Sequence, residues 1–185
     1  ISFISGCVIN KRLISNVDPY SFCGDSLVQV HLALRAILKA DMNAFFTSDM
    51  VVATRNNSKG YNFSEVFVTN FLTILSKAEA HGLNAAAIIQ VKNRALLSFY
   101  PLHILRALWR NEENMSLSYK IFDRGFKRNT LYLVLIKPMF NLPRPLAVFY
   151  SACVMCIGRL LYGDAKHGIR FLQQSLGKKQ NHYKV

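Results

Sequence analysis

The residue best placed for acid–base chemistry is Asp25, which follows Gly24 directly before an apolar run with helical spacing. A helix dipole favours the ionised form of a carboxylate in the first turn, and a preceding glycine lets a ligand approach the backbone. A catalytic base commonly occupies such a position. A short acidic side chain at such a position also caps a helix, by accepting hydrogen bonds from its free amide groups. Two alternatives therefore stay open for Asp25, a catalytic base and an N-cap.

Cysteine and histidine suggest little further chemistry. Cys153 and Cys156 have the C-x-x-C spacing, but they lie inside an apolar helical pattern without a second pair, so we expect core packing. The histidines show no ligand spacing, and neither a phosphate-binding glycine loop nor a Gly-x-Ser-x-Gly elbow is present. We predict no metal site in these residues. Few cysteines and no secretion signal indicate a reducing compartment.

The elements that would position Asp25 change from β-like to helical along the chain. Residues 3–10 and 44–54 have strand composition, and between them a helix runs from Asp25 or Ser26 to about Lys39. A turn-rich loop follows over residues 55–62. Further helices are expected over residues 63–80, 85–110, 116–128, 146–162 and 164–176. His81-Gly82 should end the first of these, Pro101 should kink or divide the second, and residues 131–136 are ambiguous.

Positive charge is concentrated in the second half of the chain. Residues 1–91 contain seven Lys and Arg against six Asp and Glu, a net charge of +1, whereas residues 92–185 contain sixteen against four, a net charge of +12. A basic half attracts phosphate in nucleic acid, in lipid headgroups or in a substrate. We therefore predict two parts, residues 1–80 with α/β character and residues 81–185 as a basic, amphipathic helical region.

An uncharged run over residues 145–158 bears on a membrane role. It is 14 residues long and lies between Arg144 and Arg159, whereas a transmembrane helix needs about 20 apolar residues. We expect it not to span a bilayer. Either it lies in the membrane interface, with the arginines at the headgroups and Phe149, Val154 and Ile157 in the apolar layer, or it is a buried core helix. Interleaved basic and apolar residues suit a lipid surface better than nucleic acid.

The order of motifs over residues 1–75 resembles a known family. "SFISGCVINKRLI", "DPYSFCGDSLVQVHLALRAIL" and "VVATRNNSKGYNF" are similar to the second half of the catalytic domain of family 2 glycosyltransferases. The likeness is strongest to bacterial sugar transferases of the abequosyltransferase kind, which build O-antigen, part of lipopolysaccharide, or capsular polysaccharide. It implies an α/β fold, the C-terminal half of a nucleotide-diphospho-sugar transferase domain of the GT-A type, followed by the helical basic region.

The resemblance assigns roles to individual residues. It makes Asp25 the general base, and it places Ser5, Gly6 and Gly24 on the acceptor side. Gly24 stands where the family commonly has Glu. A loop near the phosphates of the donor would contain the remaining candidates, which are Arg55, Asn57 and Ser58.

The implied reaction is inverting sugar transfer from a nucleotide-diphospho-sugar to a lipid-linked glycan or polysaccharide acceptor. One base deprotonates the acceptor hydroxyl, while a metal ion or cations stabilise the departing diphosphate. In the family, Mg²⁺ or Mn²⁺ is held by an Asp-x-Asp motif in the first half of the domain. This sequence has no such motif, so we expect the metal ligands and the nucleotide-binding half outside it, and no activity from this piece alone.

The same resemblance and charge pattern predict where the protein works. We expect a cytoplasmic protein, peripheral at the inner face of the bacterial plasma membrane, with the basic half against anionic lipids. The alternative is a protein of another class, a non-enzymatic basic helical module that binds membrane or nucleic acid.

Overall fold

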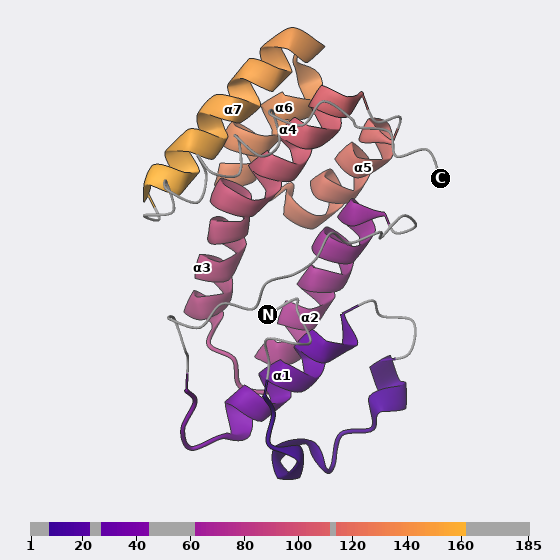
Figure 1. The fold of residues 1–185 in the computed structure, drawn as a ribbon, viewed down its shortest axis with the longest axis vertical. Helices are drawn as coiled ribbons and strands as arrows, with labels where there is room; N and C mark the ends of the chain where they lie inside the picture. Colours follow the sequence, from indigo (N-terminus) through magenta and orange to yellow (C-terminus); the bar gives the residue numbers. More distant parts are fainter. Residues whose placement is uncertain (1–7, 23–26, 45–61, 112–113, 162–185) are drawn as a thin grey trace, which may run out of the picture. The chain divides into compact units, whose positions relative to one another are not determined.

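The computed structural model describes residues 8–22, 27–44, 62–111 and 114–161, and these fold as helices joined by turns (Figure 1). The predicted α/β fold is wrong, because this described part contains no strand and no sheet core. Most of the two predicted strands falls outside it. Residues 8–10 lead into a helical turn, and Ala44 belongs to no regular element. β-prone composition in a short run does not make a strand without partners that supply a ladder.

The chain divides into two compact units, Ile1–Ile89 and Gln90–Val185, which we describe separately. The division falls within the helix α3 (Ala85–Arg94). The other elements of the first unit are η2 (Lys11–Ile14), η3 (Pro19–Phe22), α1 (Val28–Lys39), the π-helix η4 (Glu65–Asn70) and α2 (Phe71–Glu79). Those of the second are the π-helix η5 (Ala95–Phe99), α4 (Tyr100–Arg110), α5 (Met115–Phe126), the π-helix η6 (Tyr132–Ile136), α6 (Lys137–Asn141) and α7 (Arg144–Leu161).

The core of the first unit forms where α1 packs against η4 and α2. Leu27, Val66 and Ile74 are buried together there. The helix expected over residues 63–80 is confirmed, and it ends as predicted at Gly82, whose φ of +100° lies in the left-handed region that favours glycine. Helix α1 starts at Val28, after Leu27 without a side-chain cap bond, and Asp25 and Ser26 lie outside the described residues.

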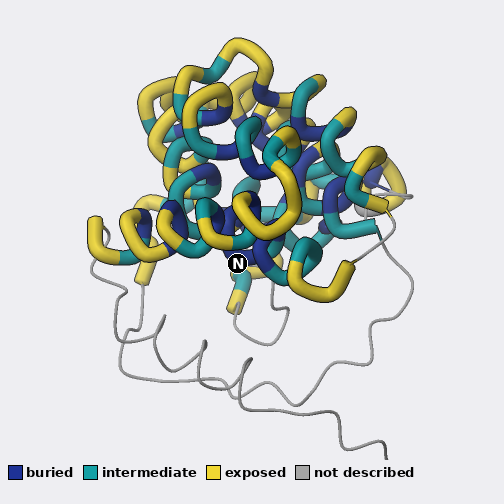
Figure 2. Tube along the Cα trace, turned by 90° about the horizontal axis from the view of Figure 1, so that it is seen from above, coloured by how far each residue is buried: buried dark blue, intermediate teal, exposed yellow. Residues whose placement is uncertain are grey.

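The second unit packs its helices around aromatic rings. The ring of Tyr100 lies 5.0 Å from that of Phe122, edge to face, and 5.7 Å from that of Phe126. Such pairs add to the free energy of burial through their electrostatic geometry. Figure 2 shows the buried residues in dark blue on the inward sides of the helices. The helices predicted over residues 116–128 and 146–162 are confirmed as α5 and α7.

Two prolines in this unit each follow a π-helix, and the helical backbone continues through them instead of ending. Pro101 follows η5 directly after Tyr100, and Pro138 follows η6 directly after Lys137. A proline has no amide hydrogen for the carbonyl four residues earlier, and its ring crowds that carbonyl. The wider turns of a π-helix accommodate this conflict. The ambiguous residues 131–136 are therefore helical, and the segment 137–145 is interrupted only near Leu142 and Pro143.

Candidate functional site

Helix α7 packs against its unit through small residues. It runs antiparallel to α4, because its first residue contacts the end of α4 and Gly158 meets η5. Figure 1 shows the two helices side by side. The buried side of α7 consists of Ala147, Ser151, Val154, Met155 and Gly158. Small residues that recur at such spacing let two helix backbones approach closely, as they do in membrane proteins.

Gly158 allows one such close approach. A Cβ atom built on this glycine would lie 1.8 Å from the carbonyl oxygen of Leu97 in η5. Leu97 is four residues before Pro101, so its carbonyl has no amide hydrogen at the position that would serve it in a regular α-helix. Glycine at position 158 therefore lets the α7 backbone lie directly against a carbonyl that the proline has freed.

A second freed carbonyl is bound by a side chain of α7. Val134 lies four residues before Pro138, and its carbonyl oxygen accepts a hydrogen bond of 2.7 Å from the phenol of Tyr150. Burial raises the pKa of Tyr150, which keeps the phenol protonated as a donor. Tyr150 thus replaces the missing amide of Pro138.

Arg144 at the start of α7 binds the end of α4. Its Nε donates to the carbonyl oxygen of Leu108 at 3.0 Å, and its Nη2 donates to that of Trp109 at 3.3 Å. The Trp109 carbonyl belongs to the last turn, where carbonyls lack an amide donor within the helix, and the Leu108 carbonyl also accepts from the amide of Asn111 at 3.3 Å. The sequence suggested Arg144 only as a headgroup contact, whereas the structure also gives it this role in capping α4.

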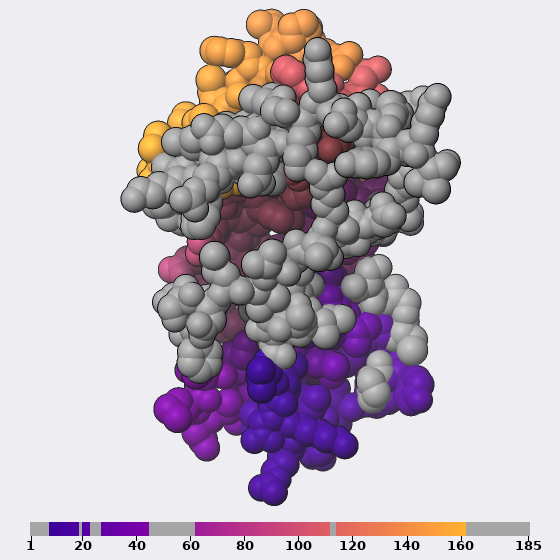
Figure 3. All heavy atoms as spheres, viewed as in Figure 1, coloured from indigo at the N-terminus to yellow at the C-terminus, as the bar shows by residue number. Residues whose placement is uncertain are grey.

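The opposite side of α7 carries large apolar side chains that no described element covers. We call it the outer face of α7, and it consists of Leu146, Phe149, Cys153, Cys156, Ile157, Leu160 and Leu161, all exposed. Phe149 is 71% exposed and Leu160 69%. The atoms of α7 are visible in orange to yellow in the space-filling view (Figure 3). This face is continuous along the helix, since its residues recur at intervals of three and four.

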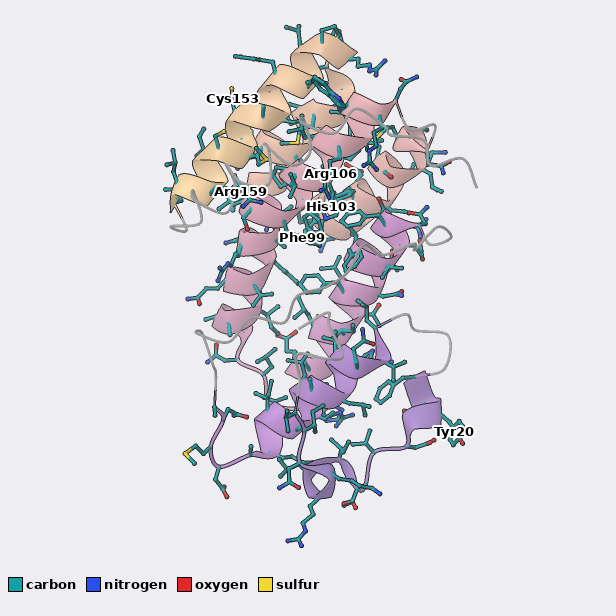
Figure 4. The ribbon with its side chains drawn as sticks, in the orientation of Figure 1. Tyr20, Phe99, His103, Arg106, Cys153 and Arg159 are labelled. Carbon is teal, nitrogen blue, oxygen red and sulfur yellow. The ribbon has the colours of Figure 1, made fainter. Side chains whose placement is uncertain are left out.

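The structure divides the residues of this helix between the two alternatives. Val154 is buried against the unit with 3% of its surface exposed, as in the core-helix alternative and not as in the interfacial one. Cys153 and Cys156, expected in the core, are exposed, and Figure 4 shows Cys153 on the outward side of α7. Because residues 145–158 are uncharged throughout, their sequence carries no polar stripe to indicate which side faces the protein. Phe149 and Ile157 do lie outward, as expected.

The surroundings of α7 are basic and aromatic. Trp109, 62% exposed, and Arg110 lie at its N-terminal end, where Arg144 binds the carbonyl of Trp109. In α4, burial and the neighbouring Arg106 lower the pKa of His103 to about 4, so this histidine is neutral at pH 7. Figure 4 shows the two side chains. The described carboxylate of this unit, Asp123, lies 3.5 Å from the Nζ of Lys137.

The candidate residues for sugar transfer lie outside the described residues. These are Ser5, Gly6, Gly24, Asp25, Arg55, Asn57 and Ser58. Their roles stay predictions. Within the described ranges, no cluster of three or more His, Cys, Asp or Glu side chains could hold a metal ion. Among the same residues, α7 is the one helix whose length and composition would allow it to cross a membrane.

No family model, curated protein or solved structure matches the chain.

Proposed function

We propose that this protein works at an anionic membrane surface, to which α7 attaches residues 90–161 without crossing the bilayer. The observation that carries this proposal is the orientation of α7. Its small residues, Ala147, Ser151 and Gly158, face the protein, while large ones such as Phe149 and Leu160 face outward. A helix stabilised only by a soluble core buries its largest apolar residues instead.

The surroundings favour a lipid surface as the occupant of the outer face. Tryptophan and arginine are enriched where hydrocarbon meets headgroups, and Trp109, Arg110 and Arg144 lie together at one end of α7. Transfer of the exposed parts of Phe149 and Ile157 into the apolar layer contributes roughly 2 to 4 kcal/mol. Each basic residue close to the surface adds about 1 kcal/mol.

Two features argue for attachment in the interface rather than for a transmembrane span. The 18 residues of α7 extend about 27 Å at 1.5 Å per residue, slightly less than the roughly 30 Å of hydrocarbon. Helix α4 lies along α7 and contains Arg106 and Arg110, which would enter the hydrocarbon if both helices crossed. Charged groups there are costly.

Liposome flotation tests the attachment. The protein should float with anionic vesicles and much less with neutral ones, and high salt should release a large fraction because charge is screened within about 10 Å at 0.1 M salt. Phe149→Ser/Ile157→Ser should weaken binding at least about thirtyfold through the lost apolar transfer. The matched control is Val91→Ser/Leu117→Ser, which removes two exposed apolar side chains from other helices of the unit.

Several results would contradict the attachment. Equal flotation with neutral and anionic vesicles would show that electrostatic attraction does not contribute to membrane binding. An equal loss of membrane binding in both double variants would show that the outer face of α7 has no special role in it. A protein that stays in the vesicles after alkaline carbonate extraction is inserted more deeply than an interfacial helix. Absence of flotation together with dimers in solution would assign the outer face to a second copy of the chain.

The activity that we propose at this surface is sugar transfer from a nucleotide-diphospho-sugar to a lipid-linked glycan. This part rests on the order of motifs over residues 1–75 and not on the described structure. It agrees with a membrane attachment, since such an acceptor is anchored in the bilayer. A sugar transferase of this kind differs from a non-enzymatic basic module in one chemical requirement, a general base.

Asp25→Asn tests that requirement in a protein that includes the nucleotide-binding half. Release of nucleoside diphosphate in the presence of membrane lipid extract should fall about 10²- to 10⁴-fold, because the acceptor hydroxyl loses its base. Affinity for the donor should stay the same. Asp41→Asn is the matched control, since Asp41 is an exposed carboxylate just after α1 and lies outside the candidate site. If the Asp25→Asn variant retains more than about a tenth of wild-type turnover, Asp25 is not the general base.

A further inference from the structure

The first unit contains a hollow of about 400 Å³ lined by η3, α1, α2 and the chain before η3. Its volume lies within the range of small-molecule sites. Arg35 and Lys39 line it from α1, and Lys77 and His81 line it from α2 and the turn after it. We propose that this hollow binds a diphosphate group.

The first argument is the arrangement of the cations. Arg35 and Lys39 are four residues apart on α1, so this pair lies on one side of the helix, and a second pair is formed by Lys77 in the last turn of α2 and His81 in the turn after it. Helices α1 and α2 pack against each other, so both pairs surround the same hollow. The like charges of Arg35 and Lys39 at this spacing repel each other and destabilise α1. A bound anion would remove that repulsion.

The second argument is the scarcity of protein carboxylates at the hollow. Asp18 is the acidic residue in its lining, and the Oδ1 of Asp18 accepts a hydrogen bond from the amide of Tyr20 at 2.9 Å. Figure 4 labels Tyr20 next to this turn. Within the described residues, Arg35, Lys39 and Lys77 form no ion pair with a carboxylate. Their charge is left for a ligand.

The third argument is that the position of Lys77 is set by packing. Its Nζ lies 5.5 Å from the centroid of the Phe22 ring, within reach of a cation–π contact. Phe22 is 6% exposed and its ring stacks on that of His31, 4.4 Å away. A lysine supported by a fixed ring loses less side-chain entropy when it binds an anion.

These groups fit a diphosphate better than a single carboxylate. A guanidinium binds phosphate oxygens in a bidentate manner, and ammonium groups act as point charges around them. Three permanently charged side chains, Arg35, Lys39 and Lys77, match the charge of a diphosphate. Such a group occurs in nucleoside diphosphates and in prenyl diphosphates, and the two sources differ in what is attached to it.

Calorimetric titration with inorganic pyrophosphate at low salt tests the site. Binding should weaken roughly tenfold in Arg35→Gln and in Lys77→Gln, because each removes a charge-assisted contact, and high salt should weaken it further. Arg12→Gln is the matched control, an exposed cation of the same unit outside the hollow. Lys39→Gln should also weaken binding, and Lys39 lies at the last position of α1, outside its buried residues, so its loss leaves the core intact.

Two further titrations separate the sources. Uridine diphosphate that binds more tightly than pyrophosphate identifies a nucleoside diphosphate, and farnesyl diphosphate that does so identifies a lipid-linked one. Absence of pyrophosphate binding, or equal weakening in the Arg12 and Arg35 variants, would overturn the proposal. The cations at the ends of α1 and α2 would then serve only to offset the helix dipoles.

Discussion

Helices α4 and α7 lie against each other and use their apolar residues in opposite ways. The buried side of α4 consists of Tyr100, Pro101, Leu102, Ile104 and Leu105. The buried side of α7 has small residues at three of its five positions, and its large aliphatic and aromatic residues are mostly exposed. The free energy that holds α4 comes largely from apolar burial, whereas α7 adds close backbone approach and hydrogen bonds to carbonyls to a smaller apolar contribution, in which Met155 packs on Leu102 and Leu105.

The contacts of α7 follow from prolines in other elements. Gly158 meets the carbonyl that Pro101 frees, and Tyr150 binds the carbonyl that Pro138 frees. Because an unpaired polar group away from water is costly, each of these contacts favours the docked helix. Substitutions on the buried side of α7 should therefore change the free energy of unfolding, and substitutions on the outer face should change attachment to the membrane. The two sides can be tested separately.

The largest effect on stability is expected at Gly158. In Gly158→Ala the new methyl would overlap the carbonyl of Leu97, so the two backbones must separate, which costs about 1 to 3 kcal/mol. The free energy of unfolding from chemical denaturation measures this cost. The matched control Gly125→Ala, at an exposed position in α5, should instead stabilise by up to about 1 kcal/mol. An unchanged stability in Gly158→Ala would mean that α7 does not depend on this approach.

A smaller effect is expected at Tyr150. Tyr150→Phe removes the hydrogen bond to the Val134 carbonyl and leaves the ring in place, which should lower the free energy of unfolding by about 1 kcal/mol. Binding to anionic vesicles should stay the same where the protein is folded. Tyr20→Phe serves as the control, because Tyr20 is 79% exposed. Equal stability of the two variants would show that the freed carbonyl needs no replacement donor.

The sequence predicted the helical elements well where apolar residues recur at helical spacing next to clear end signals. Residues 63–80 are an example, with Val66, Ile74 and Leu75 buried and Gly82 at the end. The prediction of a β-sheet was wrong, because it was inferred from β-prone runs and from a resemblance and not from strands that could pair with each other. Residues 131–136 show why composition alone is insufficient, since this β-prone segment is helical with Tyr132 and Ile136 fully buried.

The orientation of α7 could not be predicted from its own residues. Cys153 and Val154 are neighbours of similar polarity, yet one is exposed and the other is buried. Their difference is set by which side of α7 packs on α4, η5 and α6, and these elements lie close only after folding. A useful signal was present in the sequence as the small residues Ala147, Ser151 and Gly158, whose spacing indicates a side suited to close helix packing.

The outer face of α7 is most directly tested by an environment-sensitive fluorophore on Cys153, in a protein whose other cysteines are replaced by serine. Addition of anionic vesicles should shift its emission to the blue and protect it from an aqueous quencher, because this side chain enters the apolar layer. The same fluorophore on Leu117→Cys, an exposed position in α5, should respond much less. A protein that floats with the vesicles while the Cys153 fluorophore stays fully accessible to the quencher would contradict the account.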